Sequence, residues 1–344
     1  MLSESDFKRV TIIAHSGVSG IFKKEEELKK GLLISIKSAL LGFEKLIHGE
    51  SSTDAVEMSI NFMEASGHVN AGAGSVLQAD GIQRMDASIM NSKLECGCVS
   101  QIQGFLHPIS IARTIMDKKY SILGSIKGQL PDHISFDPEH TKIIAEFNNA
   151  KKFDTHNYSK IDLIQLEEEF RFFKLMKKPD VSLTGETEDE EAGADTVGTV
   201  ALDFNGLLTA GTSTGGRGNC LPGRIGDSPI IGAGTYCNSF GGASMTGFGE
   251  DVVRNCCAKR VIDLIKFNDY NAQLAVDRML KEFKETSRNS LGAIAVDHLG
   301  NFGVGMNGIC MNWAVVTALT NGKGLLLDKE IHYGSYKGME IIEK

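Results

Sequence analysis

Thr196 lies at the boundary between an acidic, aperiodic segment and an apolar strand pattern. The acidic, aperiodic residues 182–195 end at Asp195, and an apolar strand pattern begins at once with Thr196. If the backbone were cut between these residues, Thr196 would carry a free α-amino group beside its own hydroxyl. A threonine hydroxyl is a weak nucleophile until a base takes its proton, and an α-amine with a pKa of ~8 can do this near neutral pH. The junction therefore permits a threonine that is both nucleophile and base, but on this observation alone a threonine that only begins a strand is the favoured interpretation.

The residues before this junction show both helical and strand periodicity. Asp54 and Glu57 have the spacing of a helix-capping pair. Pro108 stands at the favoured first turn of a helix that ends near Lys118. We also expect a strand at 9–20, a helix at 23–48 and a β-hairpin over 75–90.

The residues after the junction begin with a hairpin. Strand patterns at 196–204 and 207–213 flank Asn205 and Gly206, a strong signal for a two-residue turn. A glycine-rich region over 214–249, helices at 250–267 and 271–285 and a hairpin over 291–306 follow. Both parts of the chain thus predict an α+β fold, with antiparallel sheets covered by helices and one shared core.

Composition excludes several classes of protein. The 344 residues hold 36 basic and 44 acidic side chains, a net charge of −8, which argues against nucleic acid or an anionic membrane as a partner. The chain has no apolar run of ~20 residues and no basic-then-apolar pattern at its start. Seven cysteines without a repeated spacing fit reduced thiols in the cytoplasm. The histidines lack metal-ligand spacing, and the glycine-rich strings lack the context of a phosphate loop.

Several strings together resemble a known family. They cover residues 196–216, 221–236 and 246–250, with shorter matches at 70–76, 85–90 and 108–114. This pattern is similar to the plant-type L-asparaginase/isoaspartyl peptidase family, whose members are threonine N-terminal-nucleophile hydrolases. The resemblance implies a four-layer αββα sandwich, in which two antiparallel sheets lie between helical layers. It also implies hydrolysis of L-asparagine to L-aspartate and ammonia, of β-aspartyl dipeptides, or of both.

The resemblance assigns Thr196 as the nucleophile and Thr214 as the residue that hydrogen-bonds it. Arg224 would bind the substrate α-carboxylate, because a guanidinium matches two oxygens. Asp227 would accept the substrate α-ammonium group. The alternative for the last two is a structural ion pair in a glycine-rich loop.

The oxyanion side of the site is also implied by the resemblance. Thr246 and Gly247 would supply a hydroxyl and a backbone N–H to the developing oxyanion, and Asn70 would support that side. Without the resemblance, Gly247 could simply permit a turn, and Asn70 could be a turn residue. His15 matches the histidine of a glycine-rich loop near the nucleophile, and we expect a structural role for it.

Self-cleavage follows from the same chemistry. The Thr196 hydroxyl would attack the Asp195 carbonyl, and the resulting ester would be hydrolysed. The products would be an α subunit of residues 1–195 and a β subunit of residues 196–344. The α subunit would end in a flexible acidic linker at about 179–195. Both would form one globular domain. The family implies a homodimer of αβ units. It implies no catalytic cofactor or metal, only a structural alkali cation held by backbone carbonyls near residues 63–69.

Three departures from the family pattern keep alternatives open. Asp195 precedes the nucleophile where many asparaginases have glycine, Ser16 replaces a loop glycine, and residues 306–313 lack the expected Thr-Glu-Gly pattern. An Asp-Thr junction also occurs in the related threonine aspartase, which lacks the Gly-Asp-Ser-Pro string kept here at 226–229. A threonine endopeptidase that cuts after Asp and an unprocessed, non-catalytic paralogue are therefore the alternatives.

Overall fold

The computed structural model of the chain describes residues 8–19, 25–124, 129–154, 158–164, 166, 196–320, 326–336 and 341–343. The acidic segment before Thr196, including Asp195 and the linker expected at 179–195, lies outside the described residues.

The described strands form two antiparallel sheets. The larger sheet has eight strands. In spatial order they are β12 (Ile341–Glu343), β11 (Leu326–Tyr336), β10 (Cys310–Thr320), β1 (Lys8–Ser19), β4 (Val197–Leu202), β5 (Leu208–Thr214), β2 (Met85–Asn91) and β3 (Cys96–Ile102). The smaller sheet has four strands, in the order β6 (Thr235–Asn238), β7 (Gly241–Gly247), β8 (Leu291–Asp297) and β9 (Phe302–Met306). Strand β1 pairs with both β4 and β10, so residues from both sides of the acidic segment share one sheet.

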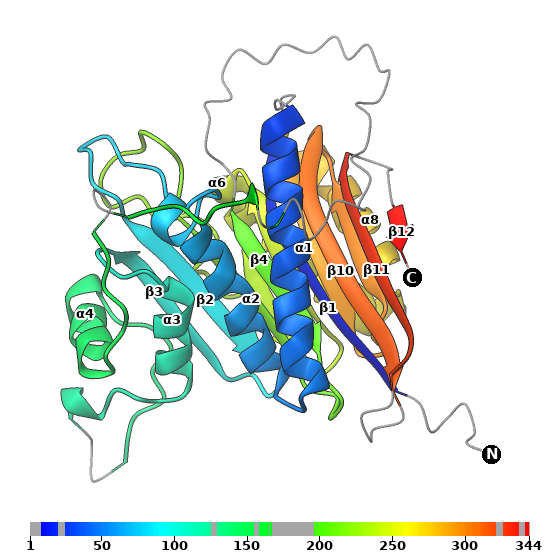
Figure 1. Cartoon of the computed structure of the whole chain (residues 1–344), viewed down its shortest axis with the longest axis horizontal. Coiled ribbons are helices and arrows are strands. Elements are labelled where there is room, and N and C mark those ends of the chain that lie inside the picture. Colours follow the sequence, from blue (N-terminus) through cyan, green and yellow to red (C-terminus); the bar gives the residue numbers. More distant parts are fainter. Residues whose placement is uncertain are drawn as a thin grey trace.

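Helices pack against both sheets. Helices α1 (Glu25–Ile47), α2 (Ser52–Ser66) and α3 (Pro108–Met116) lie across one face of the larger sheet (Figure 1), and α4 (Pro138–Phe147) packs against α3 and β3. The short α6 (Gly249–Asn255) leads into α7 (Cys257–Asn268) and α8 (Ala272–Thr286), which pack on the smaller sheet.

Buried apolar side chains fill the space between these elements. One cluster joins α1, α2 and α3 to the larger sheet, and includes Ile12, Val56 and Ile109. A second joins α7 and α8 to the smaller sheet, and includes Val261 and Met279. A third lies between the facing sheets and contains residues such as Ile13 of β1, Val200 of β4 and Ile294 of β8. The prediction of an α+β fold with antiparallel sheets covered by helices is therefore confirmed.

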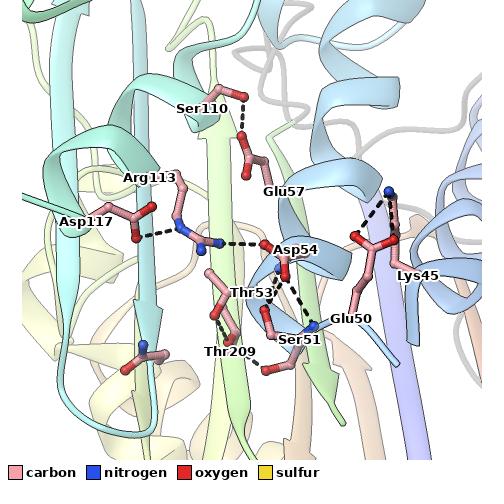
Figure 2. A network of polar contacts seen from close by, with 12 residues as sticks. Lys45, Glu50, Ser51, Thr53, Asp54, Glu57, Ser110, Arg113, Asp117 and Thr209 are labelled. Carbon is pink, nitrogen blue, oxygen red and sulfur yellow. Dashed lines mark hydrogen bonds and ion pairs between the residues drawn. The ribbon is translucent and has the colours of Figure 1, made fainter. Parts of the chain in front are cut away.

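The start of α2 differs in detail from the predicted capping pair. Ser51 caps the helix: its Oγ accepts a hydrogen bond from the Asp54 N–H at 3.2 Å, and Asp54 Oδ2 accepts one from the Ser51 N–H at 3.1 Å. Glu57 instead accepts a hydrogen bond from the Ser110 hydroxyl of α3 (2.6 Å). Figure 2 shows these contacts with Arg113 of α3, which reaches Asp54 at 3.3 Å and so ties the two helices together.

Two other expectations were wrong in their boundaries. The hairpin expected over 75–90 reduces to an isolated bridge between Leu77 and Gln83, while residues 85–91 pair with β3 and β5. The helix expected over 250–267 is broken at Cys256, which has a left-handed φ of +46°. A left-handed residue cannot continue a right-handed helix, so α6 ends there.

Candidate functional site

Thr196 lies at the end of the larger sheet, directly before β4, and its side chain is buried. The ladder between β4 and β5 pairs Val197 with Ser213, which places Thr196 beside Thr214. The Thr196 hydroxyl donates a hydrogen bond to Thr214 Oγ1 at 3.2 Å. The structure therefore brings the two predicted threonines into contact.

The loop after β5 is held by Asn70. The Asn70 amide donates to the Gly216 carbonyl at 2.7 Å, and its backbone carbonyl accepts from the Gly215 N–H at 2.9 Å. A Cβ at Gly215 would lie 2.4 Å from Asn70 Oδ1, so a larger residue would not fit. The Gly216 N–H in turn donates to Thr214 Oγ1 at 3.1 Å. Asn70 thus holds the loop whose Gly216 N–H contacts Thr214, the residue beside Thr196.

Thr246 and Gly247 end strand β7 of the facing sheet. Thr246 is fully buried, and its Oγ1 accepts a hydrogen bond from the Val18 N–H at 3.3 Å. Strand β1 runs antiparallel to β4 with His15 opposite Gly198, so Val18 lies toward the Thr196 end of β4. Gly247 has a φ of +139°, and a Cβ there would lie 2.2 Å from the Ser290 carbonyl oxygen. Only glycine fits this position.

Arg224 is paired with Glu250, an acidic residue to which the sequence alone assigned no role. Its Nε and Nη2 donate to the two carboxylate oxygens of Glu250 at 2.9 and 3.0 Å. This bidentate pair uses two of the five guanidinium N–H groups. A Cβ at Gly226 would lie 2.8 Å from Arg224 Nη1, so a larger residue there would collide with that nitrogen. Arg224 therefore retains donors for a second carboxylate.

Asp227 lies beside this pair as a buried carboxyl group. Burial raises its pKa to about 7, although the charge of Arg224 works in the opposite direction. A Cβ at Gly249 would lie 2.8 Å from Asp227 Oδ1 and 2.9 Å from Arg224 Nη2, which shows how closely the two side chains converge. Among the described residues Asp227 Oδ2 has no hydrogen-bond partner. A buried acceptor without a partner is costly, so the site is suited to a cationic ligand.

His15 is buried close to Thr196. Burial lowers its pKa to about 3, and a hydrogen bond to the backbone of Thr196 partly opposes this shift. Its Nδ1 accepts from the Gly17 N–H at 3.4 Å, which assigns the proton of the neutral ring to Nε2, 3.2 Å from Ser244 Oγ. The neutral ring therefore holds the strands in place, in keeping with the structural role expected for it. Its neighbour Ser16 donates to the Gly31 carbonyl of α1 at 3.0 Å.

Comparison with known proteins identifies the family of the chain. The chain matches the sequence model of the asparaginase family over residues 8–325. The chain belongs to the asparaginase family. A plant-type L-asparaginase of Pyrococcus horikoshii is 36% identical over 314 residues, which cover 89% of this chain and 95% of that protein. An isoaspartyl peptidase/L-asparaginase of Bos taurus is 33% identical over 308 residues, 89% of this chain and 92% of its own. A probable isoaspartyl peptidase/L-asparaginase of Drosophila pseudoobscura pseudoobscura is 34% identical over 328 residues, covering 94% and 92%.

Membership of the asparaginase family confirms the resemblance found in the sequence. The structure brings Thr196, Thr214 and Asn70 together, and it places Arg224 beside Asp227. No group of three His, Cys, Asp or Glu side chains that could hold a metal ion occurs in the described parts of the chain. None of the described helices is long and apolar enough to cross a membrane.

Two acidic residues of the site were not predicted from the sequence. Glu250 closes the string at 246–250 that carried the resemblance, so its place in the motif was a signal. Glu64 of α2 is fully buried, and its Oε1 accepts from the Ser213 hydroxyl at 2.6 Å and the Ile109 N–H at 3.0 Å. It thereby fixes the residue next to Thr214. Nothing in the local sequence around Glu64 indicates this role.

Proposed function

We propose that this chain is a self-cleaving amidohydrolase that converts L-asparagine to L-aspartate and ammonia and hydrolyses β-aspartyl dipeptides. The observation that carries the proposal is the contact between Thr196 and Thr214 at the end of the paired strands β4 and β5. The names of the relatives support both substrates, since they include plant-type L-asparaginase and isoaspartyl peptidase/L-asparaginase. Both reactions break an amide at the side-chain carbonyl of an aspartyl unit.

In the proposed reaction, the α-amine of Thr196 takes the proton of its own hydroxyl, and Oγ1 attacks the amide carbon. Thr246 Oγ1 already accepts from Val18, so its own proton is available to the oxyanion, together with the Gly247 N–H. Collapse of the tetrahedral intermediate expels ammonia or an amino acid, which leaves with the proton from the Thr196 amine. Water then hydrolyses the aspartyl ester on Thr196 and releases aspartate.

Recognition of the substrate rests on two opposite charges. Arg224 would bind the α-carboxylate through the N–H groups that Glu250 does not use, and Asp227 would bind the α-ammonium through Oδ2, which has no hydrogen-bond partner in the described parts of the chain. An internal segment of a protein has neither free group at its aspartyl residues. This pair therefore favours a free amino acid or an N-terminal β-aspartyl unit over an endopeptidase substrate.

The remaining family features belong to the same proposal. Cleavage after Asp195 would give an α subunit, 1–195, and a β subunit, 196–344, within one domain of the four-layer αββα type found in N-terminal-nucleophile hydrolases. We further propose a homodimer of αβ units in the cytoplasm.

The structural alkali cation expected near residues 63–69 also remains a proposal. A Cβ at Gly74 would lie 2.2 Å from the Val69 carbonyl oxygen, and one at Gly72 would lie 2.5 Å from that of Glu64. The two glycines thus let the chain fold closely around backbone oxygens of this segment, the type of ligand that hard cations prefer.

The test compares the wild-type protein with Thr196→Ala and Thr199→Ala. Thr199 is a buried threonine of the same strand whose hydroxyl pairs with Ser59 of α2, so it is a matched control. We expect two bands on a denaturing gel for wild type and Thr199→Ala, and one band without activity for Thr196→Ala. Ammonia release from asparagine and aspartate release from a β-aspartyl dipeptide measure turnover.

Other results would decide for the alternatives. Cleavage of protein substrates alone would support the endopeptidase that cuts after Asp. A single band and no turnover in the wild type would support the non-catalytic paralogue.

A further inference from the structure

Another buried acidic side chain, that of Asp86, lies between the proposed nucleophile and the residues proposed to bind substrate. Asp86 is in β2 and is only 1% exposed, and the ladder between β2 and β5 places it opposite Thr214. Side chains of directly opposed residues lie on the same face of a sheet. Asp86 is therefore fixed relative to Thr214, which contacts Thr196.

The Asp86 carboxylate also orders the neighbouring strand β3. Its Oδ1 accepts the Gln101 backbone N–H at 2.7 Å and the Gln101 side-chain amide at 3.3 Å. Gln101 has a φ of +57°, which is uncommon for a residue other than glycine, and the β2–β3 register shifts between Met85 and Ala87. The carboxylate thus stabilises an irregular end of β3 that turns Gln101 toward the site.

From there the contacts reach residues 223–227, which we call the recognition loop. The Gln101 amide donates to the Arg224 carbonyl at 2.8 Å, and Asp86 itself accepts a hydrogen bond from the Gly226 backbone. Gln101 Oε1 accepts from the Gln78 amide at 3.1 Å. Gln78 Oε1 in turn accepts from the Gly223 N–H at 3.2 Å. The network therefore holds the recognition loop at three backbone positions, those of Gly223, Arg224 and Gly226.

Asp86 is charged at neutral pH. Burial raises its pKa to about 6, and the hydrogen bonds from Gln101 and the charge of Arg224 work in the opposite direction. An ionised carboxylate makes stronger hydrogen bonds than a neutral group does.

We propose that Asp86 is a positioning residue that fixes the recognition loop, with Arg224 and Asp227, at a set distance from Thr196. The assignment rests on the proposed function, in which that loop binds the zwitterionic end of the substrate. Asp86 itself does not touch the substrate. Its role is to keep the bound amide aligned with the Thr196 hydroxyl.

The test uses Asp86→Asn, Gln101→Met and the double variant, with Asp203→Asn as the control. Asp203 is also a buried carboxylate of the larger sheet, accepting the Asn205 and Leu207 N–H groups at 2.9 and 3.0 Å. It lies just beyond the end of β4 that is remote from Thr196. Its substitution removes the same kind of interaction without touching the recognition loop.

We expect Asp86→Asn and Gln101→Met each to raise KM for L-asparagine about tenfold, the effect of losing a charge-assisted hydrogen bond. Self-cleavage should proceed as in wild type, because it needs Thr196 and Thr214 but not the recognition loop, and kcat should change less than KM. The double variant should be no worse than the poorer single variant, because both act through one set of contacts. Asp203→Asn should lower the melting temperature and leave KM unchanged.

The assignment is overturned if KM in both single variants stays within about twofold of that in Asp203→Asn, or if the two effects add fully in the double variant. If Asp86→Asn does not fold, the KM of Gln101→Met decides alone in the same way. A wild-type enzyme that hydrolyses neither substrate would overturn the proposed function and this assignment together. An active wild type with unchanged KM in the variants would overturn the assignment only.

Discussion

Replacing Thr214 by valine tests the contact on which the proposed nucleophile depends. Valine has nearly the same shape, so the change leaves no cavity and removes only the hydroxyl. Thr214 Oγ1 accepts hydrogen bonds from the Thr196 hydroxyl at 3.2 Å and from the Gly216 N–H at 3.1 Å. Each is worth about 0.5–1.5 kcal/mol, so the two together contribute about 1–3 kcal/mol. The bond to the Thr196 hydroxyl alone, about 0.5–1.5 kcal/mol, corresponds to a loss of roughly 2- to 13-fold in kcat. KM should be unchanged, because the recognition loop is untouched.

Thr209→Val is the matched control for this experiment. Thr209 lies in the same strand, is equally buried, and contacts the Ser52 and Thr53 hydroxyls at 2.9 and 3.0 Å (Figure 2). Thr209→Val should lower the free energy of unfolding by about as much as Thr214→Val does, but its kcat should equal that of the wild type. The assay is ammonia release from asparagine, normalised to the amount of cleaved chain on a denaturing gel. If kcat of Thr214→Val is within twofold of that of Thr209→Val, the assigned role of Thr214 is wrong.

Two further predictions concern pH and cations. Because burial raises the pKa of Asp227 to about 7, protonation below that pH removes the charge that binds an α-ammonium group. The inhibition constant of L-2-aminobutyrate, which has no amide to hydrolyse, should therefore rise about tenfold per pH unit below pH 7; a constant value from pH 5 to 8 would contradict this. The cation proposed near residues 63–69 should raise the melting temperature as sodium or potassium replaces choline at equal ionic strength. Equal melting curves in all three salts would exclude it.

Local sequence was enough to predict the elements around the nucleophile. Asn205 and Gly206 located the turn between β4 and β5, but the two-residue turn that they predict was wrong in length, since it would pair Phe204 with Leu207. In the structure Asp203 pairs with Leu207, and Gly206 has a left-handed φ of +79°, so the turn is one residue longer. This longer turn sets the register that places Thr196 opposite Thr214. The hairpin of β8 and β9 was predicted for the same reason, since its strands are adjacent in the chain.

Pairings between distant segments could not be predicted in this way. Residues 85–91 carry a clear strand pattern, but their partners are β3 and β5, and β5 begins more than a hundred residues later. Strands β10 and β11 were not predicted at all. Strand β10 is buried along nearly its whole length, so it lacks the alternation of apolar and polar residues that identifies a half-exposed strand.

Contacts between distant segments of the site could not be predicted from the sequence either. The resemblance supplied Arg224 and Asp227, but the pairing of Arg224 with Glu250 and the contact of Asp86 with Gln101 depend on the folded loops. A side chain's partners are set by which backbone segments meet, and a single sequence does not carry that information for segments so far apart.

The strand order of the larger sheet has a consequence for the cut molecule. Strand β1 lies between β4 and β10, so the first segment of the chain is inserted between two strands of the last, and β2 and β3 extend the sheet beyond β5. After cleavage before Thr196, no covalent link would remain across these borders, yet neither piece could leave without exposing several ladders of backbone hydrogen bonds. Once separated by heat, the pieces would have to find each other in solution, so refolding would become a second-order process that the uncut chain never faces.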